Sequence, residues 1–207
     1  MQWQVPRIWQ GKEVYIVGGG PSIEKLKVAE LSGKRIIVAN NSYRLFPDAH
    51  YCFFMDYHEW YVHHKKELRE TFKGNLVSCH HKFQQDPDVL YLASNGSKGL
   101  TRKPGGITNG NNSGTAAINL AFLLGATTII LIGFDMRMVD GSHNYHNECF
   151  RTKSVPEDIY KSSFIPNLAT MAVELEKEGI SVQNATPGSA LDLFPFRHDL
   201  IEALYDE

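Results

Sequence analysis

The feature that most constrains this chain is the alternation of short apolar, strand-like runs with helix-like segments. Strands are expected at 13–18, 34–40, 49–56, 75–80, 89–94, 127–135 and 180–186, and the run at 127–135 has the strongest pattern. Continuous apolar strands separated by helices are typical of a parallel sheet that is covered on both faces. The sequence therefore predicts an α/β fold, doubly wound and Rossmann-like, with a mainly parallel sheet.

Helices are expected between these strands, at 22–31, 57–72, 113–126 and 162–179, the last interrupted near Pro166. Ser113 is the expected N-cap of the helix at 113–126, and Gly125 marks its end. The histidines of the helix at 57–72 are expected to be exposed. A chain of 207 residues suits one domain, so residues 1–207 are predicted to form a single nucleotide-binding domain.

Composition excludes several classes of protein. The formal net charge of −2 gives no basic patch for nucleic acid. The three cysteines, Cys52, Cys79 and Cys149, are odd in number and widely spaced, which argues against a disulfide framework or a thiolate zinc site. Neither a signal peptide nor a membrane span is expected, because no apolar run is long enough. These features indicate a cytoplasmic protein and leave homo-oligomerisation open, with Trp3, Ile8 and Trp9 available to pack on a partner or on the core.

The first strand ends in the turn Gly18, Gly19, Gly20, Pro21, Ser22. Glycine lacks a Cβ, so the backbone here must approach something closely, either a phosphate or another part of the chain. The spacing matches neither the G-x-G-x-x-G dinucleotide motif nor a Walker loop. From the pattern alone, phosphate binding and a purely structural turn are equally supported.

Further candidates follow other strands or begin a helix, where ligands bind in open α/β sheets. Two long segments, 95–112 and 136–161, exceed the ~12–15 residues of ordinary loops and add to this set. Each candidate also has a plain structural reading as a turn or helix cap. The candidates for contacts with a nucleotide are Asn40, Asn41, Asp56, Asn112, Ser113, Gly114 and Asp135.

The segment 132–148, "IGFDMRMVDGSHNYHNE", is dense in side chains that can do chemistry. Such a concentration after the strongest strand indicates a site. His143 or His146 could act as a general base near neutral pH. Tyr145 and Arg137 could donate hydrogen bonds to a leaving group. These four residues are the predicted catalytic set.

Several short motifs, taken in order, resemble those of glycosyltransferase family 42, the bacterial sialyltransferases. They are "VGGGPS" (17–22), "ANN" (39–41), "NSGTAAINLAFLLGATTIILIGFD" (112–135), "SHNYH" (142–146) and "NATPGSALDLF" (184–194). The pattern also resembles 6-hydroxymethylpterin pyrophosphokinase-like proteins and the central domain of motility-associated-factor glycosyltransferases, and it is similar to uncharacterised tailed-phage proteins. The resemblance covers about residues 12–194.

The family 42 resemblance implies roles for particular residues. Gly18, Gly20 and Ser22 would hold the nucleotide phosphate, which favours phosphate binding over a structural turn. Asn40 would touch the nucleotide, Ser113 and Gly114 would contact the donor, and Tyr145 would steady the leaving phosphate.

Two departures from the family pattern stand out. Asp56 stands where the sialyltransferases have an asparagine, and an acidic residue there would repel a donor carboxylate. The downstream catalytic histidine has no equivalent in 148–164, so His143 or His146 would have to replace it.

Three functions are compatible with these observations. The leading hypothesis is a transferase that moves a glycosyl group from a nucleotide sugar to an acceptor hydroxyl, with no obligatory cofactor. The alternative is a pyrophosphokinase of the 6-hydroxymethylpterin type, in which Mg²⁺ held by Asp56, with Asp135 as a second candidate ligand, carries much of the catalysis. A third is a non-catalytic nucleotide-binding protein, acting in the host cytoplasm if the chain is phage-encoded.

Overall fold

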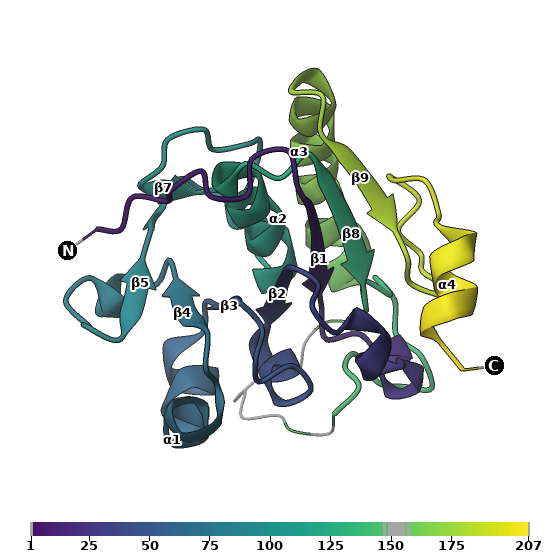
Figure 1. The fold of residues 1–207 in the computed structure, drawn as a ribbon, viewed down its shortest axis with the longest axis horizontal. Helices are drawn as coiled ribbons and strands as arrows, with labels where there is room; N and C mark the ends of the chain where they lie inside the picture. The colour runs from purple at the N-terminus through teal and green to yellow at the C-terminus, as the bar shows by residue number, and fades with distance from the viewer. Residues whose placement is uncertain (1, 147, 149–155, 157, 207) are drawn as a thin grey trace.

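A computed structural model describes residues 2–146, 148, 156 and 158–206. Its centre is a seven-stranded sheet in the order β5-β4-β3-β2-β1-β8-β9, with every neighbouring pair parallel (Figure 1). The predicted α/β class and parallel sheet are confirmed. The strands are Glu13–Val17 (β1), Ile36–Ala39 (β2), Tyr51–Phe54 (β3), Asn75–Ser78 (β4), Val89–Tyr91 (β5), Thr128–Ile132 (β8) and Ser181–Asn184 (β9).

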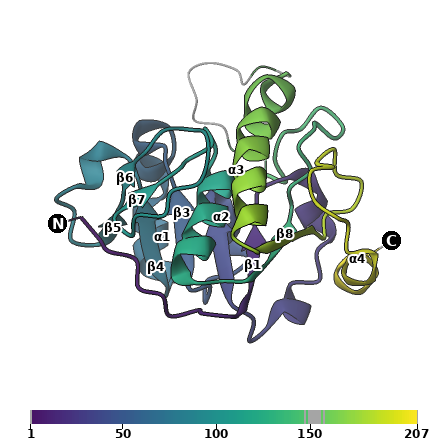
Figure 2. The same cartoon turned by 90° about the horizontal axis from the view of Figure 1, so that it is seen from above.

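Two cores lie on the two faces of this sheet because alternate strand residues point to opposite sides. On one face, Val14 and Ile16 of β1 pack with the helices Ser113–Leu124 (α2) and Ile165–Lys177 (α3). On the other face, Tyr15 and Val17 pack with short helices and with Val62–Thr71 (α1) and His198–Leu204 (α4). Figure 2 shows α2 and α3 side by side along the sheet.

Several predicted elements differ from those observed. The helix expected at 22–31 is two 3₁₀ helices, Pro21–Lys25 (η1) and Val28–Leu31 (η2). Another 3₁₀ helix, Asn40–Arg44 (η3), follows β2 directly. The polar helix at 57–72 begins as a π-helix, Tyr57–Tyr61 (η4), before α1. A further 3₁₀ helix, His81–Phe83 (η5), follows β4.

The remaining differences lie in the long loops and near the C-terminus. The segment 95–112 contains the strand Gly106–Ile107 (β7), which pairs in parallel with Ala93–Ser94 (β6) in a separate two-stranded sheet. Pro166 does not interrupt α3; it stands in the first turn, where proline is tolerated, after a π-helix at Tyr160–Phe164 (η6). The helix α4 was not predicted from the sequence.

The strand order places the topological switch point between β1 and β8. The chain runs from β1 through β2 and onward to β5 in one direction, and β8 and β9 lie on the other side of β1. In open α/β sheets, ligands bind beyond the carboxyl ends of the strands at this point. Among the described residues, no helix is long and apolar enough to cross a membrane.

Candidate functional site

The glycine turn after β1 lies directly against the turn after β8. A Cβ at Gly20 would come within 1.9 Å of Asp135 Oδ2, and one at Gly18 within 2.6 Å of the Gly133 carbonyl oxygen. At Gly19, by contrast, the nearest atom would be Asn144 Oδ1 at 3.5 Å. Two of the three glycines are therefore required for the approach of another part of the chain, which is the structural reading of the turn.

Most backbone donors of this turn are already in use. The Gly18 and Gly20 amides donate to the carbonyls of Ile132 and Gly133, at 2.8 and 3.0 Å. Ser22 donates to the Asp135 carboxylate through both its backbone N–H, at 3.1 Å, and its hydroxyl, at 2.8 Å. Among the described residues, this leaves the Gly19 amide as the donor in the turn that has no partner.

Asp135 is a buried carboxylate held by the Ser22 hydroxyl and amide. It is 3% exposed, and burial raises its pKa, while the two hydrogen bonds from Ser22 oppose that rise. The Asp135 side chain therefore joins the turn after β8 to the turn after β1.

The start of α2 offers a second place for an anion. Asn112 is the N-cap, since its side chain accepts a hydrogen bond from the Thr115 amide at 2.8 Å, so Ser113 is not the cap but the first helical residue. The amides of Ser113 and Gly114, which have no hydrogen-bond partner among the described residues, lie at the helix N-terminus, where the macrodipole favours negative charge. A twelve-residue helix with two free amides is suited to bind a phosphate.

The start of α2 adjoins both β1 and β2. The Ser113 hydroxyl donates to Asn40 Oδ1 at 3.1 Å, and Asn40 itself has a positive φ of 51°. A Cβ on Gly114 would meet the Phe134 ring at 2.9 Å, and a Cβ on Gly18 would come within 3.3 Å of the same ring. The predicted residues of three strands and one helix are thus brought together around Phe134.

The loop after β8 is fixed over this cluster. The Tyr145 amide donates to the Gly19 carbonyl at 3.1 Å, and its hydroxyl donates to the Asn41 carbonyl at 2.8 Å. The Asn41 side chain in turn donates to Glu148 at 2.9 Å. Burial raises the pKa of Tyr145 to about 12, so this phenol is protonated at neutral pH and can donate a hydrogen bond.

Arg44 also holds the loop after β8, by joining Glu148 of that loop to α1. Its guanidinium contacts Glu67 of α1 through two nitrogens, both at 2.6 Å, and Glu148 at 2.8 Å. The hydrogen bonds from Arg44 hold the pKa of Glu67 below its ordinary value. Arg44 and Glu67 were not predicted, because surface charges on separate elements give no sequence signal for pairing.

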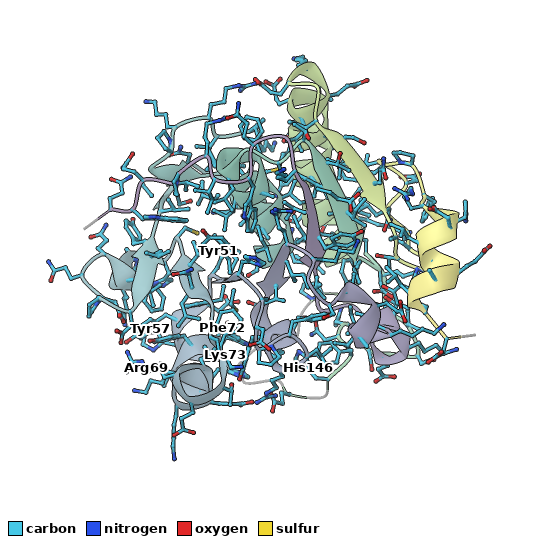
Figure 3. The ribbon with its side chains drawn as sticks, viewed as in Figure 1. Tyr51, Tyr57, Arg69, Phe72, Lys73 and His146 are labelled. Atoms are coloured by element: carbon cyan, nitrogen blue, oxygen red, sulfur yellow. The ribbon has the colours of Figure 1, made fainter. Side chains whose placement is uncertain are left out.

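The two candidate bases occupy different surroundings. His143 Nδ1 lies 3.0 Å from the hydroxyl of Tyr160, a residue that was not predicted. His146 stands at an edge-on angle to the Tyr145 ring, and burial lowers its pKa, which keeps the imidazole neutral. Its Nδ1 is buried without a hydrogen-bond partner among the described residues. Figure 3 shows His146 at the lower edge of the molecule, away from Tyr51 at the start of β3.

The other predicted residues are not in this cluster. Arg137 donates to the Gly188 carbonyl at 2.7 Å on the exposed surface.

His64 is wrongly predicted as exposed: it is 2% exposed, stacked on Trp60 and 3.1 Å from the Tyr43 hydroxyl. Cys52 and Cys79 are buried and free, whereas Cys149 lies outside the described residues, as do the other residues of 149–155 and residue 157 in the histidine-free stretch 148–164.

Asp56 follows β3, three strand positions from Asp135 after β8. With about 4.8 Å between neighbouring strands, these two positions are ~14 Å apart. A Mg²⁺ ion binds oxygen at about 2.1 Å, so the two carboxylates cannot share one ion in this arrangement. In the part of the chain that the structure describes, no three His, Cys, Asp or Glu side chains are grouped to hold a metal.

Comparison with known proteins gives a fold likeness. No protein-family profile matches the sequence, and no curated protein matches it. The chain is similar to the sialyltransferase CstII from Campylobacter jejuni in complex with cytidine-5′-monophosphate, with a TM-score of 0.54 and 16% identity over 92% of this chain and 87% of that one. The complex with the substrate analogue CMP-3FNeuAc gives 0.51 and 14% over 91% and 87%.

An apo α-2,3-sialyltransferase from the same organism gives a TM-score of 0.54 and 15% identity over 92% of this chain and 81% of that one. At this level of identity the likeness establishes a shared fold over nearly the whole of each chain. The structure therefore has the α/β fold of these sialyltransferases, as the order of the sequence motifs predicts.

Proposed function

We propose that this protein is a transferase that uses a nucleotide-activated donor, with a glycosyl group as the group transferred. The observation that carries the proposal is the cluster at the switch point, where Ser113 and Gly114 at the start of α2 lie against Asn40 after β2 and the Phe134 ring after β8. The fold likeness supports it, since one of the similar sialyltransferase structures holds cytidine-5′-monophosphate. That this protein binds a nucleotide, that the donor carries a sugar and that an acceptor hydroxyl receives it are all proposed here.

The phosphate is proposed to bind at the start of α2 rather than inside the glycine turn. In the part of the chain that the structure describes, the Ser113 and Gly114 amides have no partner, whereas Gly18, Gly20 and Ser22 donate to the end of β8 and the turn after it. The Gly19 amide, which has no partner among the described residues, is proposed as a further donor. Such preorganised donors stabilise the negative charge that develops on a leaving phosphate.

His146 is the better candidate for the general base. A base must be unprotonated to accept the proton of an acceptor hydroxyl, and burial lowers the pKa of His146. The neighbouring Tyr145 hydroxyl donates its one hydrogen to the Asn41 carbonyl, so it would have to leave that bond to donate to a leaving phosphate. Activity would then depend on the placement of the loop 142–146 against Gly19.

A thermal-shift screen tests this proposal. CMP, CDP, UDP, ADP and ATP are each added with and without Mg²⁺, since a ligand of the native state raises stability by RT ln(1 + [L]/Kd), about 2.7 kcal/mol at a hundredfold excess. We expect a metal-independent shift with a nucleotide. A shift only with ATP and Mg²⁺ would transfer the assignment to pyrophosphoryl transfer, and no shift with any of the nucleotides would contradict nucleotide binding.

A matched pair of variants locates the nucleotide. Asn40→Asp keeps the shape and the acceptor for Ser113 but adds a negative charge beside the proposed phosphate, so it should weaken binding at least tenfold, or about 1.4 kcal/mol. Asn75→Asp makes the same change in an exposed residue at the start of β4. This is the amino-terminal end of the strand, away from the carboxyl ends where the site lies, so binding should be unchanged. Equal affinities in the two variants would place the nucleotide elsewhere.

A further inference from the structure

A cavity lies beside the proposed nucleotide site, at the carboxyl ends of β3, β4 and β5. Its volume is about 560 Å³, and its lining includes Met55, Cys79, His80, Ala93 and Asn111. This volume is within the ~300–1,000 Å³ of small-molecule sites. The function proposed above assigns it no role.

The cavity has a buried apolar interior and a polar mouth. Cys79 and Tyr91 are nearly buried, and Met55 and Ala93 are half-buried. Ser94, His81 and Asn111, which also line the cavity, are exposed. A ligand in this space would meet carbon, sulfur and ring surfaces inside and hydrogen-bonding groups at the opening.

His80 is held in one orientation. Its ring is stacked between Tyr57 and His81, with ring centroids 5.7 and 4.4 Å away. Its Nδ1 accepts a hydrogen bond from the Lys82 amide at 3.3 Å, so a neutral His80 carries its proton on Nε2. Burial and the neighbouring His81 and Lys82 lower its pKa, which favours that neutral form. His80 therefore supplies a fixed N–H donor.

The mouth supplies both donors and acceptors. Ser94 Oγ accepts from Asn109 Nδ2 at 2.9 Å and from the Gly96 amide at 3.4 Å, so the hydroxyl hydrogen is left to donate. Asn111 donates its Nδ2 to Ser163 at 3.2 Å, which leaves Oδ1 as an acceptor. The set resembles neither a cation site nor an anion site, because it offers both donors and acceptors.

Charge narrows the class of ligand. The lining has no Asp, Glu, Lys or Arg. The nearby Lys82 ammonium is placed over the Tyr57 ring and 2.7 Å from His58 Nε2. A carboxylate or phosphate would find no paired cation in the cavity, and burying an unpaired charge is costly. An uncharged ring with apolar faces and hydroxyl edges would match both parts of the surface.

The geometry points to an uncharged sugar ring as the occupant of this cavity, placed against His80 and Asn111. This inference rests on the proposed function. Asn111 lines the cavity and stands two residues before Ser113, so a sugar here would lie next to the phosphate at the start of α2. The sugar could come from the donor or from the acceptor, because both carry the same chemistry.

Histidine-ring NMR tests the inference. The His80 signals of ¹⁵N-histidine-labelled protein are identified with the His80→Asn variant, whose side chain can still accept from Lys82. The probes are methyl β-galactoside and methyl α-glucoside, each with CMP or UDP present, the nucleotide sugars UDP-galactose and UDP-glucose, and N-acetylneuraminic acid. We expect an uncharged sugar to shift His80 Nε2 and N-acetylneuraminic acid not to.

The pattern of shifts identifies the source. A shift with the free glycosides assigns the cavity to an acceptor, and a shift only with the nucleotide sugars assigns it to the donor. A His80 shift with CMP or UDP alone would show a nucleobase in the cavity and overturn the inference. No shift with any sugar, in protein that still binds a nucleotide in the thermal screen, would overturn the inference while leaving the proposed function intact.

Variants provide the second readout. His80→Asn and the cavity-filling Ala93→Leu should each weaken sugar binding at least tenfold and leave the nucleotide thermal shift unchanged. His63→Asn makes the same substitution at an exposed residue of α1 and is expected to bind like the wild type. Equal sugar affinity in all three variants would contradict the cavity as the site.

Discussion

The three glycines after β1 differ in their surroundings, although they are adjacent and chemically identical. Gly18 and Gly20 face the turn after β8, whereas a Cβ on Gly19 would only make an ordinary contact with Asn144 at 3.5 Å. A tight turn, a phosphate cradle and a contact between chain segments all favour glycine. The sequence therefore predicts that the backbone is approached closely, and only the neighbouring strand decides what approaches it.

A pair of alanine substitutions separates these roles. Gly20→Ala should destabilise the fold by about 1–3 kcal/mol, because its Cβ would overlap the Asp135 carboxylate and the Gly133 carbonyl. Gly19→Ala, which meets nothing closer than 3.5 Å, should change stability little. Urea unfolding of both variants measures the difference. Equal stabilities would mean that the two turns are not packed together as described.

At the scale of elements, polar contacts join the 3₁₀ helix η3, the helix α1, and Tyr145 and Glu148 of the loop after β8, and this set of contacts is called the closure. Arg44 joins Glu67 of α1 to Glu148 of the loop, and Asn41 also donates to Glu148. These partners come from three separate parts of the chain. No local pattern in the sequence signals such a pairing, which is why the closure was not predicted.

Acid should weaken this closure. Arg44 lowers the folded-state pKa of Glu67, so the stabilisation is present above the ordinary pKa of about 4.3 and is lost as the pH falls through the lowered value. The stability difference between the wild type and Arg44→Gln should therefore be larger at pH 6 than at pH 3 in urea unfolding.

The control for this experiment is Arg7→Gln. Arg7 is exposed and takes part in none of the ion pairs found among the described residues. Its substitution removes the same charge, and we expect little change in stability at either pH. If Arg44→Gln behaved in the same way as Arg7→Gln, the Arg44 contacts would contribute nothing measurable.

The elements that the sequence predicted best are those with strong local signals. The helix α2 is rich in alanine and leucine and ends at Gly125 with a φ of 99°, and β8 is a run of β-branched and apolar residues. The 3₁₀ helices after β1 lack such a pattern, and their form depends on contacts such as that of Ile23 with Gly133. The observed N-cap is Asn112 and not the predicted Ser113. Either residue type can cap a helix, and only the backbone conformation selects one of them.

Across the whole molecule, two cores share one sheet. Each strand contributes alternate residues to both faces, as Val14 and Tyr15 of β1 do. Because loss of the sheet would expose both cores, we expect residues 2–206 to unfold in one cooperative transition, with coincident urea curves from tryptophan fluorescence and far-UV circular dichroism. Two separated transitions would contradict the single domain predicted from the chain length.

The sequence by itself determined the class of fold and the edge at which a site would form. Apolar runs of strand length separated by helices require a parallel sheet, and polar residues after those runs then meet at its carboxyl edge. The tertiary structure decided which of these residues have free donors. The order of the strands places β8 beside β1, so the Ser22 amide and hydroxyl donate to Asp135. The amides that stay available for a ligand include those at the start of α2. Hydrogen bonds between distant segments depend on this three-dimensional order, which residue types and local spacing do not encode.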